Sequence, residues 1–381
     1  MLTRQGWATL GAAIAVFVSA RLFGLIELYV LGSALVLLLV FAVVAAIRPL
    51  PRLEVRRRAR PEMVSVGEAS SVELSVANAA HRRAPKLSLW EPVGDSGGAA
   101  MQMAPLRTGE SVAATYRVPS DRRGVVELGP IRAERTDVFG LCRRHHLLPG
   151  TAAVLVVPER VPLAFPTIGS SGRLGEHLRM KSWGQTGSEF HSQREYVPGD
   201  DLRRINWKSS ARRGDLIVRE TALEGLQRCT VVLDSMASSY PDDDSFERAV
   251  TAAASVVAGA VGAAIPARLV APSIDLRGPE VAHESLRWLA MIETGDDLVD
   301  HTTAGRTRTD GLGLLVVVSG RSDTTAVTTA RSNSGPDDTL LVVTTAEAPN
   351  SGARFTVDGT SLDALQQTWA RLVMGTPAVT G

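Results

Sequence analysis

Residues 189–220 are the densest polar segment of the chain and hold side chains that could do chemistry. Charges of opposite sign interleaved in this way indicate a network of ion pairs and hydrogen bonds rather than a solvated linker. His191 with Asp200 or Asp201 would supply an acid and a base, but no nucleophile–base–orienter set accompanies them. Around Tyr196 and Trp207 lie seven basic residues (Arg194, Arg203, Arg204, Lys208, Arg212, Arg213 and Arg219) and six acidic ones (Glu189, Glu195, Asp200, Asp201, Asp215 and Glu220).

The local pattern of this stretch predicts a turn, a short helix, a second turn and a strand. Pro198-Gly199 marks the first turn, and Asp200 or Asp201 suits the N-cap of a helix that runs through Trp207. Helical spacing would place Arg203, Trp207 and Ser210 on one face. The second turn falls at residues 213–215, and the strand begins at Leu216.

Three interpretations of the stretch remain open. In the first it is structural: the charges tie it to the domain that follows, and Trp207 is a buried anchor. In the second it is a docking surface for a protein, because arginine and aromatic side chains are favoured at binding hot spots. In the third it is catalytic, through His191, Asp200 or Asp201. Binding of nucleic acid is disfavoured by the interspersed acidic residues.

The ordered motif in this stretch resembles the signature of the DUF58 family of bacterial proteins. The resemblance implies a membrane hairpin, a β-rich middle and a von Willebrand A-like α/β domain, and it implies a MoxR-type AAA ATPase as the working partner. It assigns a protein-binding or structural role, and no reaction, to the matching residues. These residues are Arg194, Glu195, Tyr196, Gly199, Asp200, Asp201, Arg203, Arg204, Trp207, Lys208 and Arg212.

Composition sets the wider bounds. The chain has 381 residues, which leaves room for roughly two or three domains. Its 41 basic and 40 acidic residues give a net charge of +1, so no overall charge points to nucleic acid. The cysteines, Cys142 and Cys229, are too few and too far apart for a disulfide scaffold or a zinc ribbon and fit a reducing compartment. Neither a P-loop nor a His-Glu-x-x-His motif is present, and the Gly-Asp-Ser-Gly-Gly run at residues 94–98 is a turn signal rather than a nucleophile elbow.

Two apolar segments near the N-terminus, at about residues 6–22 and 28–47, predict a transmembrane hairpin within residues 1–50. Each reaches the length of about 17–25 residues that a bilayer requires. Arg4 precedes the pair, and Arg48, Arg52 and residues 56–60 follow it, so the positive-inside rule predicts a cytoplasmic body. The same arginine cluster would also suit anionic lipid headgroups. The alternative is a signal peptide cleaved after residues 18–20, in which case the second segment still anchors the chain.

Residues 51–160 alternate polar and apolar side chains in short runs separated by turns, which predicts a β-sandwich. Near its end, residues 137–141 resemble the Asp-Pro-Phe-Gly-Leu element of the family, with Val138 in place of proline. We expect Asp137 to cap backbone amides there, and Phe139 and Leu141 to fill the core. Residues 161–188 are rich in glycine and serine and predict a linker between the sandwich and the last domain.

Residues 221–381 alternate strand-like and helix-like segments, which predicts a mostly parallel sheet with helices on both faces. Asp234 follows the first strand, where von Willebrand A domains place Asp-x-Ser-x-Ser on a metal ion. Asp234 and Ser238 match that motif, but Met236 replaces the first serine, and a thioether is a poor Mg²⁺ ligand. We therefore expect no cofactor, with a degenerate Mg²⁺ site as the alternative and capping by Asp234 as the simpler role.

These features together predict a membrane-anchored adaptor or assembly factor that is not an enzyme and that works with a MoxR-type AAA ATPase. We expect neither a small-molecule substrate nor nucleic acid as a partner. One alternative is a metal-dependent hydrolase that uses Asp234 or the Asp200–Asp201 pair. The other is a purely structural membrane protein of the cell envelope.

Overall fold

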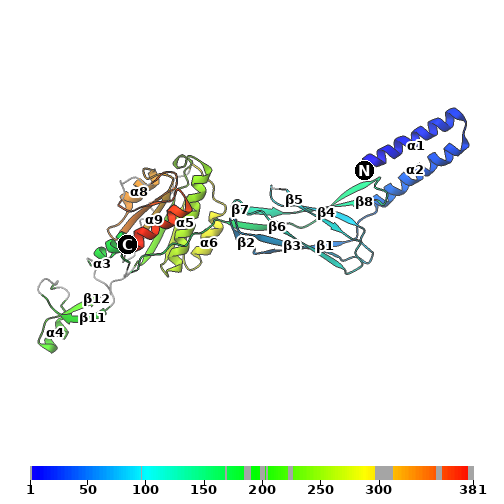
Figure 1. Cartoon of the computed structure of the whole chain (residues 1–381). Helices are drawn as coiled ribbons and strands as arrows, with labels where there is room; N and C mark the ends of the chain where they lie inside the picture. The colour runs from blue at the N-terminus through cyan, green and yellow to red at the C-terminus, as the bar shows by residue number, and fades with distance from the viewer. Residues whose placement is uncertain are drawn as a thin grey trace, which may run out of the picture. The chain divides into compact units, whose positions relative to one another are not determined.

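The computed structural model describes residues 2–95, 97–167, 170–183, 190–197, 202, 205–221, 226–296, 312–348 and 354–375. The chain divides into two compact units, Met1–Val157 and Pro158–Gly381 (Figure 1). It is a mixed α and β protein, with two apolar helices first, then many strands, and an α/β sheet in the second unit.

The first unit opens with two helices, α1 (Arg4–Phe23) and α2 (Ile26–Ile47). Thr3 caps α1 by accepting a hydrogen bond from the Gly6 amide at 3.1 Å, and Gly24, with φ of 68°, ends it. The helices contact each other, and the rings of Phe17 and Tyr29 lie 6.2 Å apart. Both helices are long and apolar enough to cross a membrane, as the sequence predicts.

Three sheets follow in the same unit. The sheet that contains residues 70–78 packs face to face with the sheet that contains residues 87–92. The alternation of buried and exposed residues along β3 shows why these segments are strands with one face in the core. The sheets have the orders β1 (Leu53–Arg60)–β3 (Ser70–Asn78)–β6 (Ser111–Val118), β5 (Gly98–Met103)–β4 (Leu87–Pro92)–β8 (Ile131–Thr136)–β9 (Arg143–Leu148), and β2 (Met63–Ser65)–β10 (Ala152–Val157)–β7 (Gly124–Leu128).

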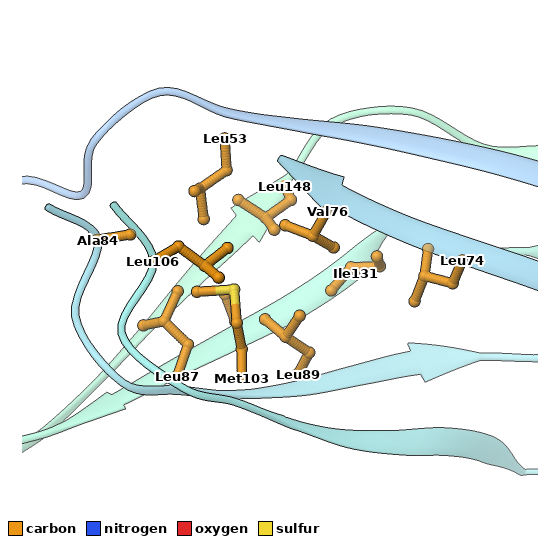
Figure 2. Packing of buried hydrophobic residues seen from close by; sticks show 11 residues of the cluster. Leu53, Leu74, Val76, Ala84, Leu87, Leu89, Met103, Leu106, Ile131 and Leu148 are labelled. Atoms are coloured by element: carbon orange, nitrogen blue, oxygen red, sulfur yellow. The ribbon is translucent and has the colours of Figure 1, made fainter. Parts of the chain in front are cut away.

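One hydrophobic core joins the first two of these sheets. Leu74 and Val76 of β3 pack with Leu87 and Leu89 of β4 and with Ile131 of β8 (Figure 2). A second buried cluster combines β3, β6, β7 and β10. Packing of two sheets face to face across a shared core is the arrangement of a β-sandwich.

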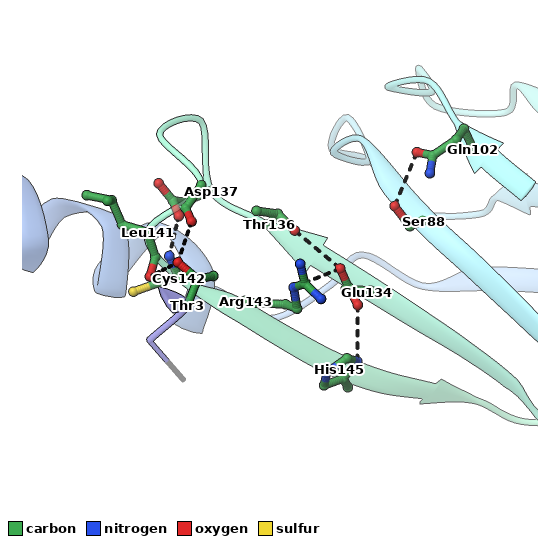
Figure 3. A network of polar contacts seen from close by, with 11 residues as sticks. Thr3, Ser88, Gln102, Glu134, Thr136, Asp137, Leu141, Cys142, Arg143 and His145 are labelled. Atoms are coloured by element: carbon green, nitrogen blue, oxygen red, sulfur yellow. Dashed lines mark hydrogen bonds and ion pairs between the residues drawn. The ribbon is translucent and has the colours of Figure 1, made fainter. Parts of the chain in front are cut away.

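The loop between β8 and β9 differs from its prediction in one respect. Asp137 caps backbone amides as expected, since its carboxylate accepts hydrogen bonds from the amides of Phe139 at 2.9 Å and Cys142 at 2.5 Å (Figure 3). Phe139, however, does not fill the core of the sandwich: its side chain is 51% exposed and its ring lies 6.4 Å from that of Phe41 in α2. Leu141 is buried, but against α2.

The second unit is built on a six-stranded sheet with the order β15–β14–β13–β16–β17–β18. All neighbouring pairs are parallel except β14 and β15. The strands are β13 (Arg228–Leu233), β14 (Ala267–Ala271), β15 (Ile274–Arg277), β16 (Gly313–Ser319), β17 (Asp338–Thr344) and β18 (Thr356–Asp358), and the helices beside them are α5 (Asp243–Gly262), α6 (Val281–Leu289), α8 (Thr325–Asn333) and α9 (Leu362–Met374).

Both faces of this sheet are covered, which explains its continuous apolar strands. Val232 and Val317 lie on the face that packs against α8. Successive residues of a strand point to opposite faces, so Val231 and Val316 point to the other one, and α5 contacts β13, β14, β16 and β17.

Residues 161–188 differ from the predicted linker over the part that the structure describes. Leu163 and Phe165 are buried, the Phe165 ring lies 5.5 Å from that of Trp369, and the Trp369 indole donates a hydrogen bond to the Ala164 carbonyl at 2.6 Å. Helix α3 (Arg173–Trp183) then contacts α9. Apolar residues supplied by α9 therefore hold this segment on the second unit, which its glycine and serine content did not indicate.

Candidate docking surface

The charged signature stretch forms a small unit of two strands and one helix. β11 (Phe190–Glu195) pairs antiparallel with β12 (Ile217–Thr221), and α4 (Trp207–Arg213) lies between them in the chain. The Asn206 amide donates to the Ile217 carbonyl at 2.7 Å, and the Tyr196 amide donates to the Leu216 carbonyl at 2.7 Å. These bonds hold the start of α4 and the end of β11 against β12.

The helix starts later than predicted. It begins at Trp207, and its N-cap is Asn206, whose side-chain oxygen accepts a hydrogen bond from the Ser209 amide at 3.3 Å. Asparagine is a favoured N-cap, so the Asn206 position was readable in the sequence although it was overlooked. Gly214, with φ of 87°, ends the helix in the left-handed conformation that glycine tolerates. Gly199, Asp200, Asp201, Arg203 and Arg204 lie outside the described residues.

One side of this unit is buried. Ile205, Ile217 and Val218 are 6%, 2% and 3% exposed, respectively. Ser210, also buried, accepts a hydrogen bond from the Ile217 amide at 2.8 Å. The Gln193 side chain of β11 donates to the Ser209 hydroxyl at 3.1 Å. Together these contacts fix the roll of α4 about its axis.

The opposite side of α4 carries Trp207, Lys208, Ala211 and Arg212, and we call these residues the α4 face. At about 100° per residue they span one continuous arc of about 140°, and all four are exposed. Trp207 is 66% exposed, so the prediction that it is a buried anchor was wrong. A buried position would have required an apolar partner, and the apolar residues Ile205, Ile217 and Val218 pack on the other side.

The remaining signature residues border this helix. Arg194 and Glu195 are exposed, and the Arg194 guanidinium donates to the Glu195 carbonyl at 3.1 Å. Tyr196 is half-buried, and Val197 and Leu216 are 57% and 42% exposed. Large apolar side chains thus accompany exposed cations in this part of the chain, a composition typical of binding surfaces. The side chain of His191 lies outside what the structure describes.

A second polar cluster lies at the carboxyl edge of the sheet. Asp234 follows β13 and is 1% exposed; its Oδ2 accepts hydrogen bonds from the hydroxyls of Ser239 and Ser319, each at 2.7 Å. Its Oδ1 accepts from the Met236 amide at 3.1 Å, so Asp234 fixes the turn after β13, whereas the neighbouring helix α5 is capped by Asp242 and not, as expected, by Asp234. The Ser319 hydroxyl also lies 3.0 Å from that of Thr324. Asp234 thus joins β13, the turn after it and β16.

These residues do not fit a magnesium site. Ser238, the predicted second ligand, is exposed, and Ser239 contacts the carboxylate in its place. Both oxygens of Asp234 already accept hydrogen bonds from the chain, and no second carboxylate accompanies it in a cluster of ligands among the described residues. Mg²⁺ would have to displace these hydrogen bonds, and the thioether of Met236 offers it no oxygen ligand. The sequence did not mark Ser239 or Thr324 as members of this cluster. Ser239 lies one position beyond the last serine of the Asp-x-Ser-x-Ser motif, and Thr324 joins the cluster through Ser319, which is far from Asp234 in the chain.

Comparison with solved structures yields only distant likenesses. The CARDB domain of the PF1109 protein from Pyrococcus furiosus is 17% identical, with a TM-score of 0.22, over 29% of this chain and 94% of that one. The putative ApaA protein from Bordetella pertussis is 13% identical, with a TM-score of 0.21, over 28% of this chain and 98% of that one. Likenesses this weak carry no argument about function.

Comparison by sequence is more specific. No curated protein matches the chain. Residues 192–265 match the family described as "Protein of unknown function DUF58". This range includes α4, β12, β13 and α5. The chain therefore contains a DUF58 segment at residues 192–265, which lies on the stretch whose motif resembled that family.

Proposed function

We propose that the protein is a membrane-anchored adaptor or assembly factor that binds other proteins and performs no reaction of its own. The single observation that carries this proposal is the exposure of Trp207 beside Lys208 and Arg212 on a helix whose other side is buried. A tryptophan left exposed to water forgoes the favourable free energy of burying its large side chain. In protein interfaces, by contrast, tryptophan and arginine are the residue types that dominate binding hot spots.

The sheet of the second unit supports a von Willebrand A-like interpretation. Renumbered along the chain, its strand order is 3-2-1-4-5-6, with the third strand antiparallel at the edge. In doubly wound sheets the ligand-binding position is the point where the strand order reverses, which here lies between β13 and β16. Asp234 and Ser319 meet at this point, and their mutual hydrogen bond occupies a carboxylate oxygen that a metal-dependent hydrolase would need for its ion.

The partner is a MoxR-type AAA ATPase, and the resemblance to the family is what supports it. An ATPase would provide the nucleotide chemistry for which this sequence has no P-loop motif. The two apolar helices would place the complex at the membrane, and the arginines around them favour a cytoplasmic body. The contacts of Thr3 with the β8–β9 loop support α1 as a retained helix rather than a cleaved signal peptide.

The experiment is affinity purification of the detergent-solubilised full chain with a purified MoxR-type ATPase from the same bacterium. The test variant combines Trp207→Ala with Lys208→Glu. The matched control combines Met291→Ala with Arg287→Glu, because Met291 is 60% exposed and Arg287 is an exposed residue of α6. We expect the test variant to weaken binding at least about tenfold, which corresponds to the loss of one hot-spot residue.

Two results would contradict the proposal: failure of the wild-type chain to retain the ATPase, or equal retention by the test variant and wild type. A turnover of small molecules by the isolated chain would also contradict it. Both variants change exposed residues only, so equal thermal midpoints will show that a loss of binding is not a loss of folding.

A further inference from the structure

A pocket of about 1050 Å³ lies in the first unit, where the ends of the two apolar helices meet the strands β8 and β9. Its polar lining is basic and rich in hydroxyls, and Leu2 and Ile47 contribute apolar surface. Figure 3 shows several of the polar residues of this region. The polar side chains of the lining are those of Thr3, Arg4, Gln5, Thr136, Arg143, Arg144 and His145.

The walls of the pocket are fixed to one another. The Thr3 hydroxyl donates to the Gly140 carbonyl at 2.6 Å, and the Thr3 amide donates to the Leu141 carbonyl at 2.9 Å. A Cβ at Gly6 would lie 2.2 Å from the Leu141 oxygen, so glycine is required for this approach of α1 to the loop. On the other side, the Arg144 guanidinium donates to the Ile47 carbonyl at 3.0 Å. The pocket therefore belongs to the fold of the unit.

The β8–β9 loop reaches alongside the helices. Phe139 contacts Phe41, which lies six residues before the end of α2, or about 9 Å along the helix at about 1.5 Å per residue. Val138, at the loop tip, is 90% exposed. An exposed valine and a half-exposed phenylalanine beside an apolar helix are typical of a segment immersed in the headgroup and upper acyl region of a bilayer.

The charge of the pocket selects for an anion. Arg4, Arg143 and Arg144 each bring a guanidinium group to the lining. The neighbouring carboxylate is Glu134, whose oxygens lie 3.0 Å from Arg143 Nε and 3.7 Å from His145 Nδ1. Asp137, whose carboxylate accepts from the Cys142 amide in the adjoining loop, is a second acidic group. Two carboxylates against three guanidinium groups still leave excess positive charge, and arginine is well matched to phosphate.

We propose that this pocket binds the phosphate headgroup of an anionic phospholipid on the side of the membrane that faces the body. The guanidinium groups would contact the phosphate, and Leu2 and Ile47 the start of the acyl chains. The inference rests on the proposed membrane anchoring by α1 and α2. It assigns lipid binding to a pocket distinct from the arginine cluster at residues 48–60.

Lipid titration tests the binding. The detergent-solubilised full chain is titrated with phosphatidylglycerol, phosphatidylcholine or inorganic phosphate, and bound molecules are counted by native mass spectrometry. The test variant is Arg4→Gln with Arg143→Gln, and the control is Arg107→Gln with Arg117→Gln, which removes equal charge from exposed residues outside the pocket. We expect phosphatidylglycerol to bind at least about tenfold more weakly to the test variant and unchanged to the control.

Equal weakening in both variants would show a nonspecific charge effect and overturn the proposal. Binding of inorganic phosphate at the same concentration as the lipid would overturn the choice of a lipid as the ligand. Binding of phosphatidylcholine as tight as that of phosphatidylglycerol would overturn the anionic requirement.

Fluorescence quenching tests the immersion without relying on the arginine variants. Cys142 and Cys229 are buried, so single cysteines introduced by Val138→Cys, Leu37→Cys or Glu73→Cys can be labelled selectively with bimane. In proteoliposomes with brominated lipids we expect quenching at positions 37 and 138 but not at 73. Quenching at 37 alone would overturn the immersion of the loop, whereas no quenching at 37 would overturn the membrane anchoring itself.

Discussion

At the scale of single residues, the clearest departure from expectation is Arg57. Its sequence position places it in the basic cluster that follows the apolar helices, but its side chain is only 5% exposed and forms an ion pair with Glu91, which is 1% exposed. Tyr116 donates a hydrogen bond from its hydroxyl to the same carboxylate at 2.8 Å. Burial, together with this hydrogen bond, raises the pKa of Tyr116 above its usual value. The sandwich thus contains a buried group in which the Arg57 and Glu91 charges compensate each other and the Tyr116 hydroxyl donates to the Glu91 carboxylate.

Glu91→Ala should therefore destabilise the first unit strongly. The change leaves the Arg57 charge buried without a counter-charge, which costs about 3–5 kcal/mol in the free energy of unfolding. Urea denaturation of the detergent-solubilised chain, followed by hydrogen exchange in β3 and β4, measures this loss. The control is Glu110→Ala, which removes a 46% exposed carboxylate 4.0 Å from Arg107 and should cost less than about 1 kcal/mol. Equal losses for both variants would show that the buried pair has no special role.

At the scale of elements, the edge hairpin of the second sheet shows how a short strand is held. β15 has only four residues, and the pattern of its sequence does not predict a strand. Arg268 of β14 donates two hydrogen bonds across the pair to the carboxylate of Asp275, at 2.7 and 2.8 Å, and Arg277 donates a third at 2.8 Å. These three charge-assisted hydrogen bonds stabilise the pairing of β15 with β14, because a strand of four residues buries few apolar side chains of its own.

The stability of this hairpin should fall in acid. The hydrogen bond from Arg268 is the main cause that holds the pKa of Asp275 below its ordinary value, with further contributions from the charges of Arg268 and Arg277. A carboxyl whose pKa is lower in the folded state stabilises the fold above its unfolded pKa of about 3.9 and loses that contribution as pH falls through the folded value.

Hydrogen exchange of β14 and β15 measured between pH 5 and pH 2.5 would reveal this dependence. Since intrinsic exchange rates also change with pH, the comparison is with Asp275→Asn, which has no titrating group at this position. We expect protection in the wild type to decline toward that of the variant below about pH 4. A constant difference across the range would contradict the role of Asp275.

At the scale of the whole molecule, the central prediction is the orientation of the chain in a membrane. Arg4 and the arginines from Arg48 onward flank the apolar helices on the side of the body, whereas the short connection at Gly24 and Leu25, at the far end of the pair, has only Arg21 near it. The positive-inside rule then places the body in the cytoplasm and the connection outside.

Cysteine labelling in intact cells and inverted vesicles tests this orientation. Ser332→Cys introduces an exposed thiol on α8, and Leu25→Cys introduces one at a side chain that is 48% exposed between the apolar helices. We expect a membrane-impermeant maleimide to label position 25 in intact cells and position 332 only in inverted vesicles. Labelling of position 332 in intact cells would reverse the proposed topology and remove the basis for a cytoplasmic ATPase partner.

Local patterns in the sequence were sufficient to predict much of the fold. The apolar lengths of α1 and α2 and the period of α5 and α9 are properties of consecutive residues, so they can be recognised without knowing the partners. The same holds for the buried strands β13 and β16, whose continuous apolar runs are typical of a sheet covered on both faces. By contrast, α8 is rich in threonine, which has a low helix propensity, and packing of Ala326 and Val327 on the sheet decides its conformation.

What the tertiary structure alone decided is which side of each element is buried and which distant groups meet. By itself, the sequence determined that the chain has an apolar helix pair, a β-rich part, a DUF58 signature and a parallel α/β sheet. It did not determine that Trp207 is exposed, that Arg57 is buried or that Ser319 reaches Asp234, because each depends on residues far away in the chain. Burial and hydrogen bonding act between neighbours in space, whereas propensity and periodicity act between neighbours in sequence.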